Sequence, residues 1–280
     1  MAVSEKLKSL VAQMPDPDGR GMFTENIDKE KIERAVAEIA QGGRQNVEGL
    51  VEMLGEPGSE ENVKPHYALH CVVNHALIAK DENARRQVCE TLIRKLDSDL
   101  STFNKGFLCQ ELQWAGRREA VAALGKLLAN EELVEPASMA LVAIKDGAAD
   151  QFLTALPKAQ GKCRLSIVDG LAALADPKAA GVLKDALKDP DREVRIAAGS
   201  GLAKIGDAGS VDLLIKAADC EPGWERIQQT RHCMVLAEKL AAAGKKTEAG
   251  RIYNHLRSTR KDASEKYIRE AAEKALSAAK

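Results

Sequence analysis

The stretch DPDREVRIAAGSGLAKIGD spans residues 189–207 and is open to two interpretations. Its Gly-Ser-Gly core at residues 199–201 is either a phosphate-binding turn or part of a helix in a repeated unit. A dinucleotide-binding fingerprint needs a third glycine at position 204 and a strand before it, but position 204 is a lysine and the preceding segment has a helical pattern. Asp189-Pro190 is typical of a turn and Asp191 of a helix N-cap. The stretch therefore predicts a turn followed by a helix.

Two glycines, Gly199 and Gly201, fall in the middle of this predicted helix. Glycine inside a helix costs about 1 kcal/mol relative to alanine, so its presence there needs a structural reason. Because glycine has no side chain, we expect neighbouring helices to approach closely at these two positions.

The helix predicted in this stretch recurs along the chain at intervals of about 30 residues. We number each helix backwards from the position where we expect it to end. These reference positions are Asp81, Arg117, Asp146, Asp176 and Asp207. Apolar residues stand nine, five and two residues before them, which places them on one face of a helix. The residues nine before are Val72, Leu108, Ala137, Ile167 and Ala198; five before are Ala76, Leu112, Leu141, Leu171 and Leu202; two before are Ala79, Ala115, Ile144, Leu174 and Ile205.

A second helix is expected after each of these helices, as in AVAALGKLLAN at residues 120–130 and AAGVLKDALKD at 179–189. Each unit is then a helical hairpin of about 30 residues, which cannot bury its apolar stripes alone. Neighbouring hairpins must stack and share a continuous core. The sequence thus predicts an all-α fold, a right-handed α-solenoid of about seven stacked helical hairpins.

The segment DPDREVRIAAGSGLAKIGDAGSVDLLIKA at residues 189–217 resembles the HEAT-repeat family, especially the short bacterial repeats also found in phycobilisome-lyase-like proteins. Asp-Pro opens its inter-helix turn, Val194 and Arg195 start the second helix, and Gly206-Asp207 closes it. The resemblance implies an N-terminal helical cap at 1–43, a HEAT-like array at 44–244 and a C-terminal cap at 245–280. The unit at 44–80 is looser, with an EPGSEENVKP insertion, and LAEKLAAAGKKTEAGRIYNHL at 236–256 resembles a tetratricopeptide helix pair.

Composition limits the location of the protein and the state of its cysteines. No apolar run approaches the roughly 18 residues that a membrane-spanning helix needs, so we expect no membrane insertion. The N-terminal MAVSEKLKSLVAQMPD has charges where a signal peptide has its apolar centre, which favours a cytoplasmic protein and leaves a signal peptide removed earlier as the alternative. The six cysteines match no short zinc or redox spacing, and we expect them to be reduced and mostly buried.

The segment HYALHCVVNHALIAK at residues 66–80 raises the question of a metal site. His66 and His70 are four residues apart, and so are Cys71 and His75. The two pairs point about 100° apart around a helix and cannot converge on one ion without outside ligands. The HEAT-repeat metalloenzyme deoxyhypusine hydroxylase resembles this architecture but depends on His-Glu pairs, which this sequence lacks. We therefore expect structural or surface histidines and no metal.

Catalytic signatures are also missing from the sequence. It contains no Gly-x-Ser-x-Gly elbow, and no Cys/His pair has a recognisable local pattern. A DNA glycosylase built from HEAT-like repeats would need a basic groove with aromatic residues, whereas residues 1–220 hold 28 Lys and Arg against 34 Asp and Glu. We expect neither an enzyme nor a cofactor.

A binding surface is expected opposite the apolar stripe, seven and three residues before each reference position. In HEAT proteins this side of the repeat is concave, so the resemblance implies a partner-binding groove there, while the alternative is an ordinary solvated face. Trp114 is its strongest candidate because an exposed aromatic is a common interface anchor. The predicted groove residues are Asn74, Gln110, Trp114, Asp169, Ser200 and Lys204.

These observations predict a non-catalytic protein-interaction module or scaffold whose partner and oligomeric state stay open. The second hypothesis is an accessory subunit or interaction region of an enzyme system, such as a chromophore-lyase-like subunit. The third is nucleic-acid binding, which we do not favour, through a basic C-terminal surface that includes Arg257, Arg260 and Lys261. Residues 221–280 hold 13 Lys and Arg against 8 Asp and Glu, and a solvated helix face also explains this excess.

Overall fold

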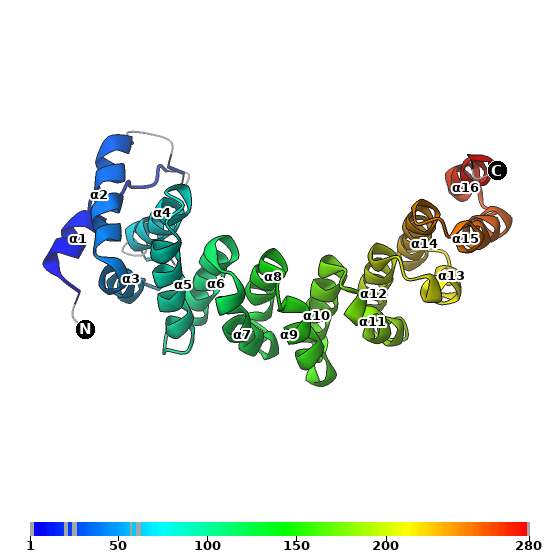
Figure 1. The fold of residues 1–280 in the computed structure, drawn as a ribbon, viewed down its shortest axis with the longest axis horizontal. Helices are drawn as coiled ribbons and strands as arrows, with labels where there is room; N and C mark the ends of the chain where they lie inside the picture. The colour runs from blue at the N-terminus through cyan, green and yellow to red at the C-terminus, as the bar shows by residue number, and fades with distance from the viewer. Residues whose placement is uncertain (1–2, 20–21, 24–26, 57, 60–62, 279–280) are drawn as a thin grey trace. The chain divides into compact units, whose positions relative to one another are not determined.

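A computed structural model describes residues 3–19, 22–23, 27–56, 58–59 and 63–278, and Figure 1 shows the fold. This described part of the chain folds into sixteen α-helices joined by turns and short 3₁₀ segments, without a strand. The all-α repeat fold predicted from the sequence is therefore confirmed. Contacts divide the chain into two compact units, Met1–Ala148 (unit 1) and Ala149–Lys280 (unit 2).

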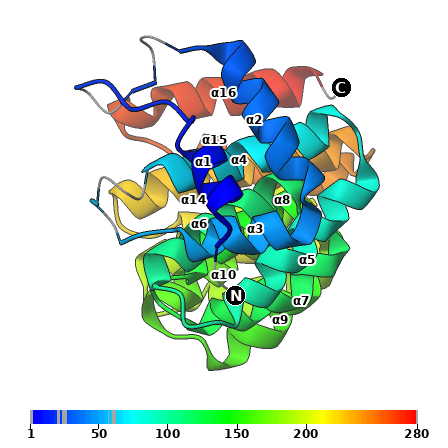
Figure 2. The same cartoon turned by 90° about the vertical axis from the view of Figure 1, so that its left-hand side faces the viewer.

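Unit 1 consists of two helical layers. Helices α2, α4, α6 and α8 pack side by side in chain order, and α3, α5 and α7 pack in the second layer. Helix α1 packs on α2, α3 and α4 at the N-terminal end, onto which Figure 2 looks. The helices are α1 (Glu5–Val11), α2 (Lys29–Gln41), α3 (Gly43–Glu52), α4 (Val63–Ile78), α5 (Glu82–Leu96), α6 (Thr102–Ala115), α7 (Arg118–Lys126) and α8 (Val134–Ile144).

Unit 2 repeats this arrangement, with α10, α12 and α14 side by side in chain order. Helix α11 packs on α12, α13 packs on α14 and α15, and the chain finishes with the consecutive contacts of α14, α15 and α16. The helices are α9 (Ala148–Ala155), α10 (Gly161–Leu174), α11 (Ala180–Ala186), α12 (Arg192–Ile205), α13 (Val211–Ala218), α14 (Trp224–Ala242), α15 (Lys246–Thr259) and α16 (Lys266–Ala278).

All ten residues at the predicted core positions, nine and five residues before each reference position, are buried. The position two residues before is different: Ala115 is buried, Ala79 is exposed, and Ile144, Leu174 and Ile205 are half-buried. This part of the predicted stripe is wrong because the position is the last residue of its helix, or in α4 lies beyond the helix end. A side chain at the edge of a layer has fewer neighbours to cover it.

The recurrent aspartates begin the next helical segment, whereas the sequence pattern treated them as helix ends. Asp81 accepts a hydrogen bond from the backbone N–H of Ala84 at the start of α5 (3.0 Å). Asp176 and Asp207 cap the 3₁₀ turns before α11 and α13 in the same way. An aspartate carboxylate satisfies N–H groups that the first turn of a helix leaves without partners, which explains its recurrence.

The stretch that decides the fold has the predicted turn and helix. The Asp191 carboxylate accepts a hydrogen bond from the Glu193 backbone N–H (2.8 Å), as an N-cap does. The buried Asp189 carboxylate closes the turn by accepting from the Asp191 N–H (2.9 Å) and from Arg164 Nε (2.5 Å). Helix α12 ends at Gly206, whose φ of 77° is favoured by glycine.

Gly199 and Gly201 lie inside α12 where other helices approach it. A Cβ atom at Gly199 would lie 2.2 Å from Gln229 Oε1 on α14, and one at Gly201 would lie 2.7 Å from Leu183 Cδ1 on α11. The predicted close contacts are therefore confirmed. The Gly-Ser-Gly core is a packing feature of a helix, because both glycines are in contact with neighbouring helices.

The two ends of the chain agree with the predicted helices. Asp28 caps α2, and α14 and α15 form the expected pair around Gly244, with Ala249 and Tyr253 buried. Within EPGSEENVKP, residues 57 and 60–62 lie outside the described residues. The same holds for residues 20–21, between α1 and α2, and for residues 279–280. That 1–43 and 245–280 act as caps stays a prediction. Among the described residues, no helix combines the length and apolar character needed to cross a membrane.

Candidate functional site

Two rows of side chains lie on the solvent side of α4, α6, α8, α10 and α12, seven and three residues before each reference position. Every member is exposed or half-buried, so the predicted exposure of these rows is confirmed, while partner binding stays a prediction. Of the predicted site residues, Asn74, Gln110 and Trp114 lie in unit 1, and Asp169, Ser200 and Lys204 lie in unit 2. The rows comprise Asn74, Gln110, Met139, Asp169 and Ser200, and Ile78, Trp114, Ala143, Ala173 and Lys204.

In unit 1 the rows expose large apolar side chains. Ile78 on α4 is 82% exposed, Trp114 on α6 is 64% exposed, and Met139 on α8 is 57% exposed. We call these three residues the apolar row. They occupy three helices that pack in order, Met139 from the row seven residues before the reference position and the other two from the row three before, and exposed large apolar groups are a feature of interaction surfaces.

A hollow of about 670 Å³ lies beside the apolar row, between α2 and α4. Its walls include Ile32, Val36 and Ala37 from α2, and Cys71 and Ile78 from α4. The predicted site residue Asn74 also lines it. We call it the unit 1 hollow. Its mostly apolar walls suit an apolar side chain, and the Asn74 amide can orient a polar group.

A polar cluster on α4 and α6 adjoins the rows and was missed in the sequence. The Glu111 carboxylate, whose side chain is 2% exposed, lies 3.0 Å from His70 Nδ1, and the Asn74 amide donates to His70 Nε2 at 2.8 Å. Nε2 is then the acceptor, so Nδ1 carries the proton donated to Glu111. The hydrogen bond to Glu111 raises the pKa of His70. This cluster fixes the position of Asn74 in the rows.

In unit 2 the rows line a polar hollow of about 450 Å³ between α10, α12 and α14. Three predicted site residues, Asp169, Ser200 and Lys204, are part of its wall. Helix α14 contributes side chains that were not predicted, among them Gln228, Arg231 and His232. We call it the unit 2 hollow. The structure thus brings half of the predicted residues together around one concavity.

The electrostatics of the unit 2 hollow are mixed. Loss of water raises the pKa of Asp169, while the Lys204 charge lowers it and Glu193 raises it further. Lys204 and Arg231 both lower the pKa of His232, after the larger effect of burial. Arg231 therefore lies near His232 on α14, whereas Lys204 lies close enough to act on both His232 and Asp169.

His232 forms the floor of the unit 2 hollow and is 8% exposed. Gln229 donates its amide to the Arg195 carbonyl oxygen (3.0 Å), which turns Gln229 Oε1 toward His232 Nδ1 (3.3 Å). Nδ1 must then carry the proton, and Nε2 keeps its lone pair. Burial lowers the pKa of His232 to about 4. The ring is neutral at pH 7 and offers one fixed acceptor.

The histidine and cysteine pairs of α4 do not converge. The His66 ring packs on Phe107 with centroids 4.4 Å apart, and His70 is engaged with Glu111. Burial raises the pKa of Cys71, which also interacts with Tyr67. In the part of the chain that the structure describes, no three His, Cys, Asp or Glu side chains are grouped as metal ligands would be. Metal content itself stays a prediction.

The cysteines are free, as expected, and four of the six are buried. Burial raises the pKa of Cys89 to about 11, and the pKa of Cys109 and Cys233 to about 12. A thiol with so high a pKa carries almost no thiolate at neutral pH, so these three cysteines are packing residues.

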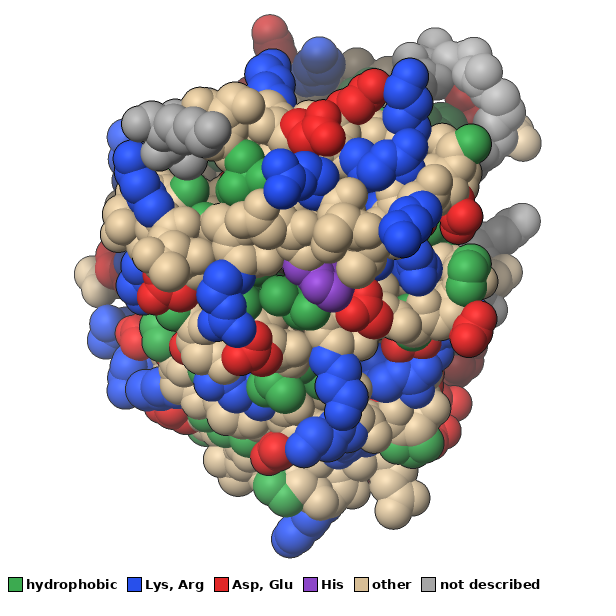
Figure 3. Space-filling model, turned by 90° about the vertical axis from the view of Figure 1, so that its right-hand side faces the viewer, with side chains coloured by type: hydrophobic (Ala, Val, Ile, Leu, Met, Phe, Trp, Pro, Cys, Tyr) green, Lys and Arg blue, Asp and Glu red, His purple; other side chains and the backbone are tan. Residues whose placement is uncertain are grey.

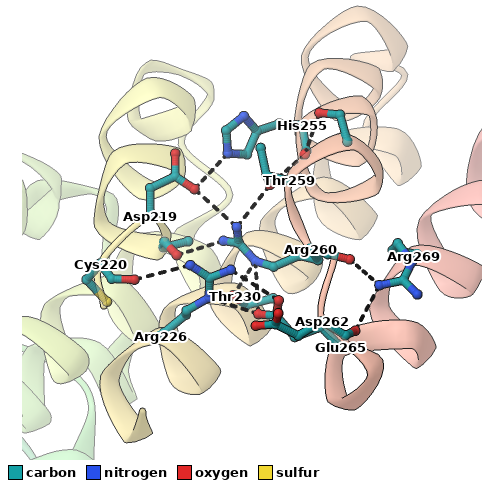
Figure 4. Close-up of polar contacts among 12 residues, drawn as sticks. Asp219, Cys220, Arg226, Thr230, His255, Thr259, Arg260, Asp262, Glu265 and Arg269 are labelled. Atoms are coloured by element: carbon teal, nitrogen blue, oxygen red, sulfur yellow. Dashed lines mark hydrogen bonds and ion pairs between the residues drawn. The ribbon is translucent and has the colours of Figure 1, made fainter. Parts of the chain in front are cut away.

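Arg260 corrects the expected basic C-terminal surface, because it is fully buried; Figure 4 shows its polar contacts. Its guanidinium donates to the Ala218 carbonyl oxygen (2.7 Å) and to Thr230 Oγ1 (3.2 Å), and pairs with Asp219 (3.1 Å). A buried arginine needs such partners, since an unpaired charge is costly away from water. Arg260 therefore joins α13, α14 and α15 and is not available to a ligand.

Other cations of this end are also engaged within the fold. Arg226 pairs with Glu265 (2.8 Å), Arg251 pairs with Asp212, and Arg269 donates to the Asp262 carbonyl oxygen (2.9 Å). Figure 3 looks onto the end of the molecule that carries the C-terminal helices, where Lys and Arg side chains are interspersed with Asp and Glu. A surface of mixed sign lacks the continuous basic patch that nucleic-acid binding uses.

Comparison with known proteins places these units among helical repeat proteins. Residues 149–234 match the family described as HEAT repeats. No curated protein matches the chain. The narrower likeness to phycobilisome-lyase-like proteins stays a prediction.

Solved structures give the same fold. The karyopherin Kap121p bound to the extreme C-terminus of the protein phosphatase Cdc14p is similar over 94% of this chain and 33% of that chain, with 13% identity and a TM-score of 0.53. Kap121p bound to Nup53p is similar over 97% and 34%, with 12% identity and a TM-score of 0.52. An engineered protein is similar over 98% and 78%, with 20% identity and a TM-score of 0.49. This chain therefore spans about a third of the karyopherin's length and shares its repeat-solenoid fold.

Proposed function

We propose that this chain is a non-catalytic protein-interaction module or scaffold, whose partner binds on the exposed rows of unit 1, with the rows of unit 2 as a separate contact. Repeat folds of this kind present adjacent helices as one extended surface. The similar Kap121p structures contain bound proteins, which supports the same class of partner here.

The apolar row is the observation that carries the proposal. Ile78, Trp114 and Met139 expose most of their side chains, whereas most other apolar residues of unit 1 are buried; Met22 and Phe103, which are also exposed, lie outside the rows. Covering apolar surface releases about 25 cal/mol per Å², so a partner that covers this row gains affinity. A tryptophan at the centre of such a surface is a frequent hot spot.

The surroundings of the apolar row provide orientation as well as affinity. The unit 1 hollow beside Ile78 accepts an apolar side chain of the partner. Asn74 and the exposed Gln110 then offer amide groups to the partner's backbone. Because amides carry no charge, the contacts that Asn74 and Gln110 make with the partner should depend little on salt.

The test is affinity capture from native extract, followed by measurement of Kd with the purified partner. Trp114→Ala should weaken binding about 30-fold, which corresponds to about 2 kcal/mol. Trp224→Ala is the matched control, since Trp224 is also more than half exposed but begins α14 in unit 2, outside the rows. It should change Kd less than twofold.

The opposite result would move the interface to the other layer. Arg86 is exposed on α5, which belongs to the second layer of unit 1. If folded Trp114→Ala and Ile78→Ser retain full affinity while Arg86→Glu abolishes binding, the proposed surface is wrong.

A further inference from the structure

The unit 2 hollow collects charges that the fold leaves without ion-pair partners. Some charges of unit 2 pair between elements, as in Arg164 with Asp189 and Arg195 with Glu225, whereas others at its surface, such as Lys216 and Glu238, have no ion pair among the described residues. Within the described residues, Asp169, Lys204 and Arg231 have no ion-pair partner, although all three line one concavity. Unpaired charges of both signs around a hollow are arranged for a ligand that carries both signs.

The two signs of charge enter the hollow from different helices. Asp169 stands on α10 and lies within reach of Lys204 and of the Glu193 carboxylate at the start of α12, which pairs with the exposed Arg192 (2.8 Å). Arg231 on α14 acts on His232, and Lys204 in the last turn of α12 acts on both His232 and Asp169, so the cations extend from α14 to the end of α12. A ligand that lies across α12 meets the carboxylates first and the cations second.

The floor of the hollow suits a polypeptide backbone. His232 Nε2 has no hydrogen-bond partner among the described residues, and its lone pair accepts a backbone N–H. The Gln228 amide and the Ser200 hydroxyl, also in the wall, can each donate to a backbone carbonyl oxygen. Leu165, Ile196 and Val235 supply apolar surface between these polar groups.

We infer that the unit 2 hollow binds an extended peptide segment of a partner protein, with a basic side chain against Asp169 and Glu193 and an acidic side chain against Lys204 and Arg231. The inference rests on the proposed function only for the class of partner, a protein. It places a second contact in unit 2 whose chemistry is ionic, apart from the apolar row of unit 1.

The size of the hollow sets the length of the segment. Packed helices lie about 8–10 Å apart, so α10 to α14 span about 16–20 Å. An extended chain advances about 3.3 Å per residue, which gives five or six residues across the three helices. Because the charged side chains of the hollow and of the ligand extend toward each other, the two charged residues of the ligand need to be only about three to five residues apart.

The experiment uses the full chain and a set of acetylated, amidated heptapeptides built from Ala, Ser and Gly with one Lys and one Glu. The two charges are placed two to six residues apart in both orders, and Kd is measured by fluorescence anisotropy at 150 mM NaCl. We expect one order and a narrow range of separations to bind at least tenfold tighter than the uncharged heptapeptide. Methylation of a single backbone nitrogen, the one over His232, should weaken that peptide more than methylation at any other position.

Charge reversal tests which side chains are responsible. Asp169→Lys should weaken the best Lys/Glu peptide at least tenfold and make the matching Glu/Glu peptide the tighter ligand. Arg231→Glu should weaken it likewise and favour the Lys/Lys peptide. Asp185→Lys and Lys188→Glu are the matched controls, because both residues are exposed at the α11 side of unit 2 and neither lines the hollow. They should change Kd less than twofold.

Three outcomes would overturn the inference. The first is that no charged heptapeptide binds better than the uncharged one, and the second is that charge reversal fails to switch the preference. The third is that a free Lys-Glu dipeptide binds as tightly as the best heptapeptide, which would indicate a small-molecule site. Trp114→Ala should not alter heptapeptide binding, so a failure of the unit 1 surface and a failure of the unit 2 hollow give different results.

Discussion

Equivalent positions of the repeat carry different chemistry in the two units. In unit 1 the exposed rows hold Ile78, Trp114 and Met139 without any charged side chain, whereas in unit 2 they hold Asp169 and Lys204. The core positions beneath them are the same, with fully buried leucines in both units. Stacking therefore constrains only the inner face of each helix, and the outer face is free to acquire separate binding properties.

The pKa shifts of one histidine in each unit also differ between the two units. His70 in unit 1 has its pKa raised by the hydrogen bond to Glu111. His232 in unit 2 has no carboxylate partner among the described residues, and burial with two nearby cations lowers its pKa to about 4. The pKa of the same residue type is thus shifted in opposite directions in the two units.

The largest expected effect tests the shared core. Leu112→Ala and Leu141→Ala in unit 1, and Leu171→Ala and Leu202→Ala in unit 2, should each cost about 2–5 kcal/mol of unfolding free energy, because all four side chains are fully buried. Hydrogen exchange should lose protection mainly in the unit that carries the change. Denaturant unfolding measures the first effect. An unchanged midpoint for the pair in either unit would break the equivalence of the two cores.

The sequence predicted this core well because a period of 3.6 residues repeats in every unit and local pattern alone determines it. It also predicted that the rows are exposed, since they lie opposite the apolar stripe. The error at four of the five positions two residues before the reference came from helix ends, which lie two or three residues earlier than the pattern placed them.

Polar partners across units of the repeat were not predictable in this way. Arg260 follows Thr259 and precedes Lys261, which in sequence is typical of a basic surface, and its partners Ala218 and Asp219 stand about 40 residues earlier. Glu111 offered a weak signal, because the equivalent position six residues before the reference is a small buried residue in α8, α10 and α12. A glutamate there indicates a buried polar partner, but only the structure identifies it as His70.

The next effect concerns pH and contrasts the two histidines. His232 has its folded pKa lowered to about 4 against about 6.5 unfolded, so the unfolded state binds more protons between these values and acid destabilises unit 2. The contribution of His232 to the free energy of unfolding is fully present above pH 6.5. It is smaller by roughly 2 kcal/mol at pH 5 and by about 3 kcal/mol at pH 4. His70 has the opposite sign: its raised pKa stabilises unit 1 below pH 6.5 and loses this effect as pH rises through the folded pKa.

Urea unfolding between pH 7.5 and pH 5, followed by hydrogen exchange in each unit, measures these two trends. In His232→Leu the decline of unit 2 between pH 6.5 and pH 5 should largely disappear, whatever the absolute stability of the variant. His70→Gln should remove the opposing trend of unit 1 and leave unit 2 unchanged. Parallel pH dependence of both units would contradict the assignment of opposite histidine environments.

The smallest effect concerns the glycine that makes the unit 2 hollow possible. Eight residues before the reference position, the other helices carry Val73, Cys109, Ser138 and Val168, and only α12 has a glycine, Gly199. A Cβ there would lie 2.2 Å from Gln229 Oε1 and 2.9 Å from His232 Nδ1, so Gly199→Ala must displace the groups that fix the histidine. We expect a loss of about 1–2 kcal/mol, since overpacking outweighs the better helix propensity of alanine. Gly250→Ala is the matched control in α15, where a Cβ meets nothing within 4 Å, and it should stabilise by up to about 1 kcal/mol. Thermal unfolding of the two variants compares them directly. If Gly199→Ala is as stable as Gly250→Ala, the close approach of α14 to α12 does not depend on this glycine, and the contrast between the two units loses its structural cause.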